Sequence, residues 1–441
     1  MGGRLNLFQC AMLRWRELHP YCAAHVIRIP APLDAARLES RIAGALEALG
    51  LTGYVLDAGR RRFAWAGGAV HVAVPVLEGG GAPLERAAAE IELLINRPFA
   101  ASGAFDPFRF FAVRESHDAF LLGLVYDHIV AGGDSIVVLM TDLSDRYLAA
   151  REDDVPLPRL ERHPATYGAL VRRQLPRFLA TLTSLPAQLA GWRQARRPGI
   201  KDPADGYNGF VHFAVSAANH ARLRAAAREL GVTVNDLMFA IVLKVVAPLW
   251  GGARPGARRS QVAVASVVNV RDDYQGPATE VFGPFLASMR VVHPVPPGVT
   301  IAELAASVHA QTSRAKRRKL QYLTLAGLAI AGLMWRWSGV ERRQRLYLKY
   351  HPAFAGLTPL NVNRLRRRGA SSDGDYLRGA STGPMSAMVL SVTVSGAAMR
   401  VGITYRRAAL SRVEMDRVVG ELLQHIEQMP CHNEAPSPAD C

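Results

Sequence analysis

The segment "LLGLVYDHIVAGGDSIVVLMTDL", residues 121–143, places one histidine between two different kinds of element. Its apolar start predicts a buried strand. The spacing of apolar residues further on predicts an amphipathic helix over 136–150, with Asp134 or Ser135 as its N-cap. His128 stands at the end of the strand, which leaves two interpretations: an imidazole satisfied by backbone or water, or a catalytic group.

The turn after His128 favours the catalytic interpretation. Gly132 and Gly133 let the backbone turn tightly and leave room for a ligand. The following helix points its positive end into the same turn, which favours an anion that develops there. A neutral imidazole in this place can act as a general base. The sequence lacks the GK[ST] ending of a phosphate loop, a GxSxG elbow around Ser135 and an HExxH zinc motif.

The composition is that of a globular protein with acidic partners. The chain has 441 residues, 49% of them hydrophobic and 20% charged, and its net charge is +16. At roughly 150 residues per domain this length predicts two or three domains. The positive charge suits nucleic acid, anionic lipid, coenzyme A or an acidic carrier protein. Because the arginines are scattered and no nucleic-acid-binding motif occurs, we expect no nucleic-acid partner.

The cysteines and the first residues bear on the compartment. The four cysteines form no CxxC pair and lie near no histidine cluster, so neither a metal site nor a disulfide framework is expected. The first 21 residues have no uninterrupted apolar core and no small-residue cleavage site, so we expect no secretory signal. Both observations predict a cytoplasmic protein with reduced thiols.

Alternating strand and helix patterns predict an α/β protein with mixed sheets, built from two halves. We expect an N-terminal half at 1–170 with the histidine, linker helices and a loop at 171–205, a C-terminal half at 206–430, and a disordered tail at 431–441. The elements expected in the first half are strands at 20–30, 61–66, 69–77, 108–115 and 119–128 and helices at 33–49, 84–99 and 136–150. The second half is expected to open with a helix, a turn and a helix capped by Thr233, and to close with a hairpin and a helix at 412–428.

The segment "DHIVAGGDS", residues 127–135, follows an apolar strand and resembles the HHxxxDG motif of the chloramphenicol-acetyltransferase-like superfamily. That superfamily includes nonribosomal peptide condensation domains and wax ester synthases. His128 matches the second histidine, Gly133 the glycine and Ser135 a serine that often follows. Asp127 stands at the first histidine, and Gly132 stands where the motif has its aspartate.

Other segments resemble the same family in the same order. They are "LINRPFAASGAFDPFRFFAV" at 94–113, "GVTVNDLMFAIVLKVV" at 231–246, "VAVASVVNVRDD" at 262–273, "VFGPFLASMRVV" at 281–292 and "MRVGITYRRAALSRVEMDRVVGELLQHI" at 399–426. The resemblance implies two similar halves that form a V with a tunnel between them and the histidine at its middle. It also implies that Ser135, Asn269, Arg271, Gly283 and Ser288 border the substrates.

In the family the motif aspartate pairs with an arginine of the second half and holds the histidine loop. Arg271, at the end of "VVNVR", matches that arginine. Since residue 132 is glycine, Asp134 could supply the carboxylate instead. Two simpler interpretations stay open: Asp134 as a helix N-cap, and Arg271 as an ordinary surface or ion-pair arginine.

The resemblance implies an acyltransferase. His128 would take a proton from a hydroxyl acceptor, or less readily an amine, as it attacks a thioester, with no covalent intermediate. No cofactor or metal would be bound. The donor would be a phosphopantetheine thioester, on coenzyme A or a carrier protein in trans, and the acceptor a small molecule or lipid, with the protein a monomer. The alternative is a catalytically degenerate relative that binds acyl groups or a carrier.

Residues 314–345, "RAKRRKLQYLTLAGLAIAGLMWRWSGVERRQR", form a second unusual segment. Its stretch at 323–335 has no charge and is too short to span a bilayer of about 30 Å. A buried helix is one interpretation. The other is an interfacial helix, with basic flanks on anionic lipid and Trp335 and Trp337 at the headgroups, which would give the protein a peripheral membrane contact.

Overall fold

Strand β8 (Ala119–Asp127), the strand that leads to His128, is buried at every position because it occupies the middle of a five-stranded sheet. The computed structural model describes residues 2–150, 155–156, 158, 171–172, 174–250, 258–273, 282–350, 352–365 and 376–429. The tail predicted at 431–441 lies outside these residues. Strand β8 runs antiparallel to both of its neighbours, and the strands expected at 108–115 and 119–128 form a hairpin.

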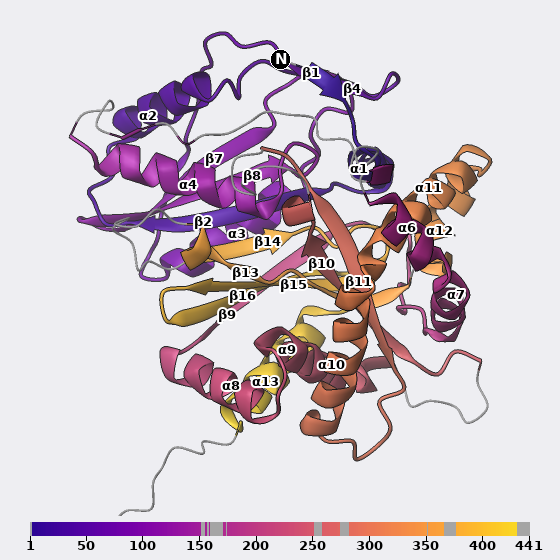
Figure 1. The fold of residues 1–441 in the computed structure, drawn as a ribbon. Coiled ribbons are helices and arrows are strands. Elements are labelled where there is room, and N and C mark those ends of the chain that lie inside the picture. The colour runs from indigo at the N-terminus through magenta and orange to yellow at the C-terminus, as the bar shows by residue number, and fades with distance from the viewer. Residues whose placement is uncertain are drawn as a thin grey trace, which may run out of the picture.

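Strands from both ends of the chain build the five-stranded sheet. Their order is β14 (Tyr376–Ala380), β2 (Cys22–Ile29), β8, β7 (Phe108–Ser116) and β5 (Val76–Glu78). Helices α2 (Ala35–Ala48) and α4 (Gly133–Leu148) cover one face, and α3 (Pro83–Ile95) covers the other (Figure 1). Side chains alternate between the faces along each strand, so the sheet is buried on both sides.

The strand expected at 69–77 is mostly wrong, because only Val76–Glu78 pairs with a neighbour. The residues before it are held by a helix instead of a strand. The Glu47 carboxylate of α2 accepts from the Val70 N–H, and the Glu39 carboxylate accepts from the Val74 N–H. The alternation of apolar residues therefore predicted an extended segment, but it did not show which groups accept hydrogen bonds from its backbone N–H groups.

A small sheet and a helix complete the N-terminal half. The sheet has the order β1 (Gly2–Arg4), β4 (Arg62–Trp65), β3 (Tyr54–Asp57) and β6 (Gly103–Ala104). Helix α1 (Leu7–Leu18) was not predicted, although Asn6 and Gln9 form a capping box at its start.

The C-terminal half is built on a seven-stranded sheet. Its order is β11 (Leu286–His293), β10 (Val262–Asn269), β12 (Ala353–Leu357), β15 (Ser386–Ser395), β16 (Ala398–Arg406) and β9 (Asn208–Val215), with β13 (Leu360–Asn361) also paired to β15. Helices α8 (Ala217–Glu229), α9 (Val234–Val246), α10 (Ile301–Arg317) and α13 (Arg412–Glu427) share its core, and Figure 1 shows them below the sheet. Thr233 caps α9 as expected.

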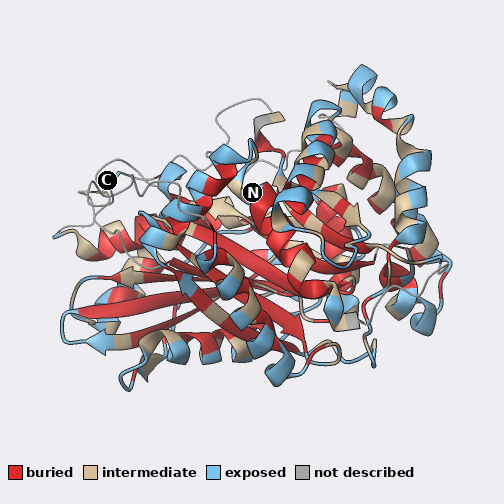
Figure 2. Ribbon diagram, turned by 90° about the horizontal axis from the view of Figure 1, so that it is seen from below, coloured by how far each residue is buried: buried red, intermediate tan, exposed pale blue. Residues whose placement is uncertain are grey.

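Shorter elements lie around the two sheets. They are helices α6 (Leu175–Leu182), α7 (Leu185–Gln194), α11 (Leu323–Arg336) and α12 (Val340–Tyr350) and the 3-10 turns η2 (Pro248–Trp250), η3 (Arg271–Asp273), η4 (Leu320–Tyr322) and η5 (Val362–Arg364). Within the described residues α6 and α7 match the broken helices expected before residue 205. Figure 2 shows the buried strands inside and the exposed outer faces of helices around them.

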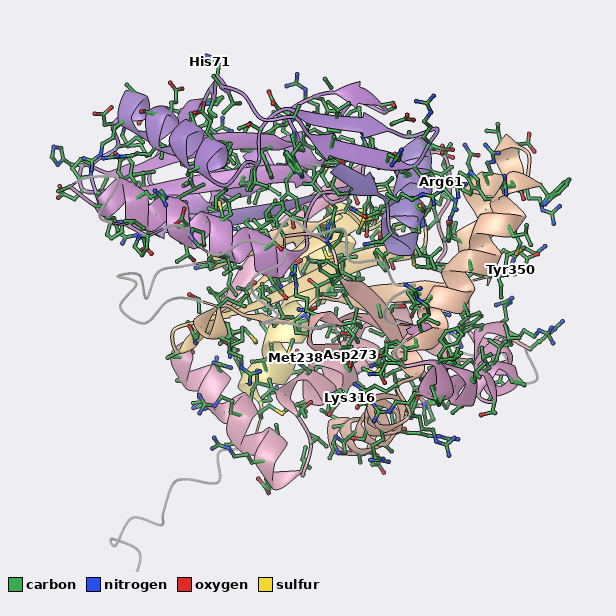
Figure 3. All side chains as sticks on the ribbon, turned by 45° about the horizontal axis from the view of Figure 1, so that its top comes forward. Arg61, His71, Met238, Asp273, Lys316 and Tyr350 are labelled. Atoms are coloured by element: carbon green, nitrogen blue, oxygen red, sulfur yellow. The ribbon has the colours of Figure 1, made fainter. Side chains whose placement is uncertain are left out.

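Helix α11 is the uncharged segment of the sequence, and it is half-buried. Leu325, Leu328 and Trp335 join the core that contains α1. Apolar side chains also remain on the outside, with Ile330 52%, Leu333 58% and Trp337 82% exposed. Figure 3 shows Tyr350, which ends the following α12, at the margin of the molecule. No described helix is long and apolar enough to cross a membrane.

Strand β14 joins the two halves. It comes from the C-terminal part of the chain but pairs with β2 of the N-terminal sheet, Arg378 opposite His25. It also packs against β15 and β16. A Cβ on Gly402 of β16 would collide with the carbonyl oxygen of Arg378, so a glycine is needed for this approach. The expected mixed α/β class with two lobes is confirmed, while the exact domain boundaries stay a prediction.

We predict that Gly402→Ala destabilises the whole fold by about 1–3 kcal/mol, because the new methyl group must push β14 away from β16. Gly420→Ala is the matched control: Gly420 lies in α13 with nothing near its Cβ position, and alanine should stabilise that helix by up to about 1 kcal/mol. Urea unfolding measures both. Equal stabilities for the two variants would contradict the close approach of β14.

Candidate active site

His128 follows β8 in a turn that fixes its tautomer. Its Nδ1 lies 3.0 Å from the Ala131 carbonyl oxygen, which can only accept a hydrogen bond. The Nδ1 atom must therefore carry the proton, and in the neutral ring Nε2 keeps its lone pair. The imidazole is stacked on the Tyr21 ring, with centroids 5.5 Å apart and planes 12° apart, and it meets the edge of Tyr126.

The surroundings of His128 keep it neutral. Burial lowers the pKa of His128 below its usual value, and the Arg378 guanidinium lowers it further, although the hydrogen bond to Ala131 opposes the shift. A histidine with a lowered pKa is unprotonated at neutral pH. The arrangement thus provides a free nitrogen base at the end of a buried strand.

Asp127, at the position of the motif's first histidine, takes no part in the cavity. Its carboxylate lies 3.1 Å from Arg16 of α1, and it accepts from the Ile129 N–H. Burial raises the pKa of Asp127 to about 6, against the opposing effect of Arg16. This buried ion pair ties the strand end to α1.

The first turn of α4 is fastened to the C-terminal half by Arg271. The guanidinium Nε lies 3.6 Å from the Asp134 carboxylate, and Nη2 donates to Ser135 Oγ and to the Gly283 carbonyl, both at 2.7 Å. Asn269 donates to Asp134 as well. Arg271 is only 6% exposed, so it is not a surface arginine. We name this set of residues 134, 135, 269, 271 and 283 the latch.

The backbone completes the latch. Gly132 N–H donates to the Gly283 carbonyl at 3.3 Å, and Gly283 N–H donates to Ser135 Oγ at 3.3 Å. The turn η3 that contains Arg271 is held in addition by Lys319, which donates to Asp273 at 2.9 Å (Asp273 is labelled in Figure 3). Each half therefore contributes donors and acceptors to the same small network.

The prediction that Asp134 or Ser135 caps α4 is wrong. The helix begins one turn earlier than expected, at Gly133, its N-cap is Gly132, and no side chain caps it. The two side chains lie in the first turn and contact Arg271. A glycine N-cap costs only a few tenths of a kcal/mol relative to a capping side chain.

A cavity of about 250 Å³ lies between the two halves. Of the residues singled out from the sequence, His128, Gly133, Asp134, Asn269 and Ser288 line it. Ser288 is held by Thr324 of α11, which donates to its carbonyl. Ser135, Arg271 and Gly283 lie behind this wall. In the described residues no three histidine, cysteine, aspartate or glutamate side chains come together as a metal site.

Sequence reasoning missed the polar residues that lie around His128 in the cavity region. His25 of β2, Tyr126 of β8 and Arg378 of β14 line it, and Tyr376 holds His25 by a 2.7 Å contact from its hydroxyl to Nδ1. The signal for His25 was a histidine inside the apolar strand pattern "CAAHVIRI". Arg378 had a weaker signal, since no strand was expected around it.

Gly132 leaves room for the side chain that the motif has at this position. A Cβ there would lie 3.5 Å from the Gly283 carbonyl and 3.8 Å from Arg271 Nη2, which are ordinary contacts. An aspartate at residue 132 could therefore reach Arg271 without moving the chain. A carboxylate at residue 132 can therefore be tested as a replacement for the carboxylate at residue 134.

We predict that Asp134→Ala and Arg271→Ala are energetically coupled, by about 0.5–3 kcal/mol in a double-mutant cycle of unfolding free energies. Adding Gly132→Asp to Asp134→Ala should restore much of the lost stability, because the new carboxylate lies beside the same guanidinium. Glu115→Ala, at an ion pair on the sheet edge, is the control that Gly132→Asp should not rescue. Additive effects of Asp134→Ala and Arg271→Ala would contradict the latch.

Solved structures of other proteins share this architecture. No protein-family model and no curated protein sequence matches the chain. The first condensation domain of the CDA synthetase is similar with a TM-score of 0.69 at 15% identity, covering 97% of this chain and 96% of that chain.

Two further structures show the same likeness. The EpoB cyclization-docking bidomain from Sorangium cellulosum gives a TM-score of 0.69 at 13% identity, covering 97% and 85%. The X-domain in complex with OxyB from teicoplanin biosynthesis gives 0.57 at 18%, covering 96% and 93%. The chain therefore has the fold of the condensation domains, and the predicted resemblance to the chloramphenicol-acetyltransferase-like superfamily is confirmed at the level of the fold.

Proposed function

We propose that this protein is an acyltransferase that moves an acyl group from a phosphopantetheine thioester to a hydroxyl acceptor, with His128 as the general base. The observation that carries the proposal is the fixed tautomer of His128 beside a cavity lined by both halves. An amine acceptor is compatible with the same chemistry, but a hydroxyl gains more from a base because it is the weaker nucleophile.

The reaction follows from these positions. Nε2 of His128 takes the acceptor's proton as its oxygen attacks the thioester carbonyl, and a tetrahedral oxyanion forms. The positive N-terminus of α4, which begins at Gly133 on the cavity wall, favours that charge. On collapse the C–S bond breaks, and the His128 imidazolium returns the proton to the leaving thiolate. No covalent enzyme intermediate is needed.

The latch has a supporting role in this proposal. It holds the first turn of α4 against the end of β10, the turn η3 and the segment before β11, and so it fixes the position of Gly133 in the cavity wall. Positioning of this kind contributes to rate because reacting groups must stay within a narrow range of distance and angle. Asp134 would do here what the motif aspartate does two residues earlier in the family.

The donor is proposed to arrive in trans, on coenzyme A or on a carrier protein. Both are acidic and suit a chain with a net charge of +16. We also propose that the protein is a monomer in the cytoplasm. The exposed apolar side chains of α11 are proposed to contact a membrane, which would suit a lipid acceptor as well as a small molecule.

The rival function is a binding module without catalysis. Gly132 in place of the motif aspartate is the observation that favours it, and the X-domain in complex with OxyB provides a precedent for a partner-binding protein of this fold. The two functions differ in one respect that can be measured: only the enzyme needs the Nε2 lone pair of His128.

We predict that His128→Ala lowers the rate of transfer by about 10²–10⁴, the usual contribution of a positioned base. Purified protein would be tested with acyl-CoA and acyl-carrier donors against a panel of alcohols and amines, with product followed by mass spectrometry. His117→Ala, in an exposed turn, is the control and should change nothing. Undiminished product formation by the His128→Ala variant would remove the base assignment.

We also predict the acidic limit of activity. A general base works only when unprotonated, so kcat/KM falls as the pH falls through the pKa of His128 in the folded protein. Since burial lowers that pKa below its usual value of 6.5, the acidic midpoint of the pH–rate profile should lie below pH 6.5. A pH–rate profile with its acidic midpoint above 6.5 would show that His128 is not in the described environment.

A further inference from the structure

Arg378 is a charged residue of the cavity wall that the proposed mechanism does not use. It lies on β14 opposite His25, is 7% exposed and lines the cavity. A Cβ placed on Gly133 would lie 3.2 Å from its Nη1 and 3.8 Å from His25 Nε2. The guanidinium is therefore aimed at the first residue of α4.

The other two nitrogens of Arg378 are held by uncharged groups. Nε donates to Thr393 Oγ1 at 2.9 Å, and Nη2 donates to the carbonyl oxygens of Val392, at 3.1 Å, and Thr358. These contacts with β15 and the loop before β13 leave the side chain a single orientation. Among the described residues Nη1 has no hydrogen-bond acceptor, and no carboxylate forms an ion pair with Arg378.

The neighbours of Arg378 do not neutralise it. Burial lowers the pKa of His25 well below its usual value, and burial raises the pKa of Tyr126, so both side chains are uncharged at neutral pH. The nearest acid with an effect on Arg378 is Asp134, and it has the smallest influence of the groups that act on it. Its carboxylate contacts Asn269 and Arg271.

A buried cation without a counter-ion is costly, and here it stands beside a second positive feature. Gly133 is the first residue of the 16-residue helix α4, so its N–H lies outside the helical hydrogen-bond ladder. A helix N-terminus that lies beside an arginine nitrogen can form an anion site.

We propose that Arg378 and the N-terminus of α4 bind the carboxylate of the acceptor, so that the acceptor is a free hydroxy acid or amino acid, with its hydroxyl or amine beside His128. A carboxylate fits better than a phosphate, because one guanidinium nitrogen and one backbone N–H match a single negative charge. The identification of the ligand as the acceptor rests on the proposed acyltransferase function; the carboxylate site itself does not.

The same donors could instead serve only the oxyanion of the transition state. The two roles differ in the ground state, since an acceptor carboxylate is bound before the reaction and an oxyanion is not. Binding without turnover therefore decides between them.

The experiment is calorimetric titration with two matched pairs of probes, 3-phenyllactate against its methyl ester and benzoate against benzamide. The acids should bind about tenfold or more tightly than their neutral partners, as a hydrogen-bonded charge pair contributes. Arg378→Met should abolish this preference, whereas Arg378→Lys should keep part of it. Arg28→Met, at an exposed ion pair on the neighbouring strand, should keep all of it.

A second variant covers the case in which Arg378→Met does not fold. Gly133→Ala leaves the arginine in place and fills the space in front of Nη1, so it should also abolish the preference. Equal binding of acids and neutral partners by the unaltered protein, or a preference that survives in these variants, would overturn the proposal. His128→Ala should bind the acids normally, so an absence of transferase activity with acid-selective binding would refute the proposed function and leave this site standing.

Discussion

The close approach of β14 to β16 at Gly402 is the constraint on which the rest of the molecule depends. Strand β14 has to pair with β2 of one sheet and pack against β15 and β16 of the other. The carbonyl of Arg378 occupies the space that any side chain at residue 402 would fill. Strand β14 belongs to the five-stranded sheet, and this contact is where it packs against the seven-stranded sheet.

Strand β14 also places a charged side chain, Arg378, in the cavity wall. Because Arg378 is opposite His25 in the N-terminal sheet and bonded to Thr393 and Val392 of the C-terminal sheet, its position is fixed by both halves at once. Burial is the main cause of the lowered pKa of His128, and the Arg378 charge that adds to this effect is held at the joint between the lobes.

Local patterns in the sequence predicted local features well. The buried strand before His128 and the presence of a helix after the glycine turn were predicted correctly, because each is decided by residues close in the chain, although the helix begins one turn earlier than expected. The expectation of a contact between Asp134 and Arg271 came from a resemblance to a family, since no periodicity could relate residues so far apart. The Asp134 and Arg271 side chains meet because their charges are opposite and because η3 contacts the first turn of α4.

Features that depend on distant partners could not be predicted. Strand β14 has five residues and follows a segment outside the described residues, and it is a strand because β2 offers it a partner. The sequence around Arg378 does not distinguish it from other arginines, because only the pairing of β14 with β2 places it beside Gly133. The segment at 69–77 shows the converse, a strand-like pattern whose backbone is satisfied by Glu39 and Glu47 of a helix.

The substitution of Gly132 for an aspartate is intelligible from the geometry of the first turn of α4. Residue 132 is the N-cap and residue 134 lies two positions further on, so both can face the same guanidinium. With glycine at the N-cap, the backbone N–H of residue 132 donates to Gly283, and the carboxylate that meets Arg271 comes from inside the helix. There it also lies near the positive helix end, where an acidic side chain is stabilising. The latch thus keeps a charge pair with Arg271, so the missing motif aspartate is no sign by itself that the site has decayed.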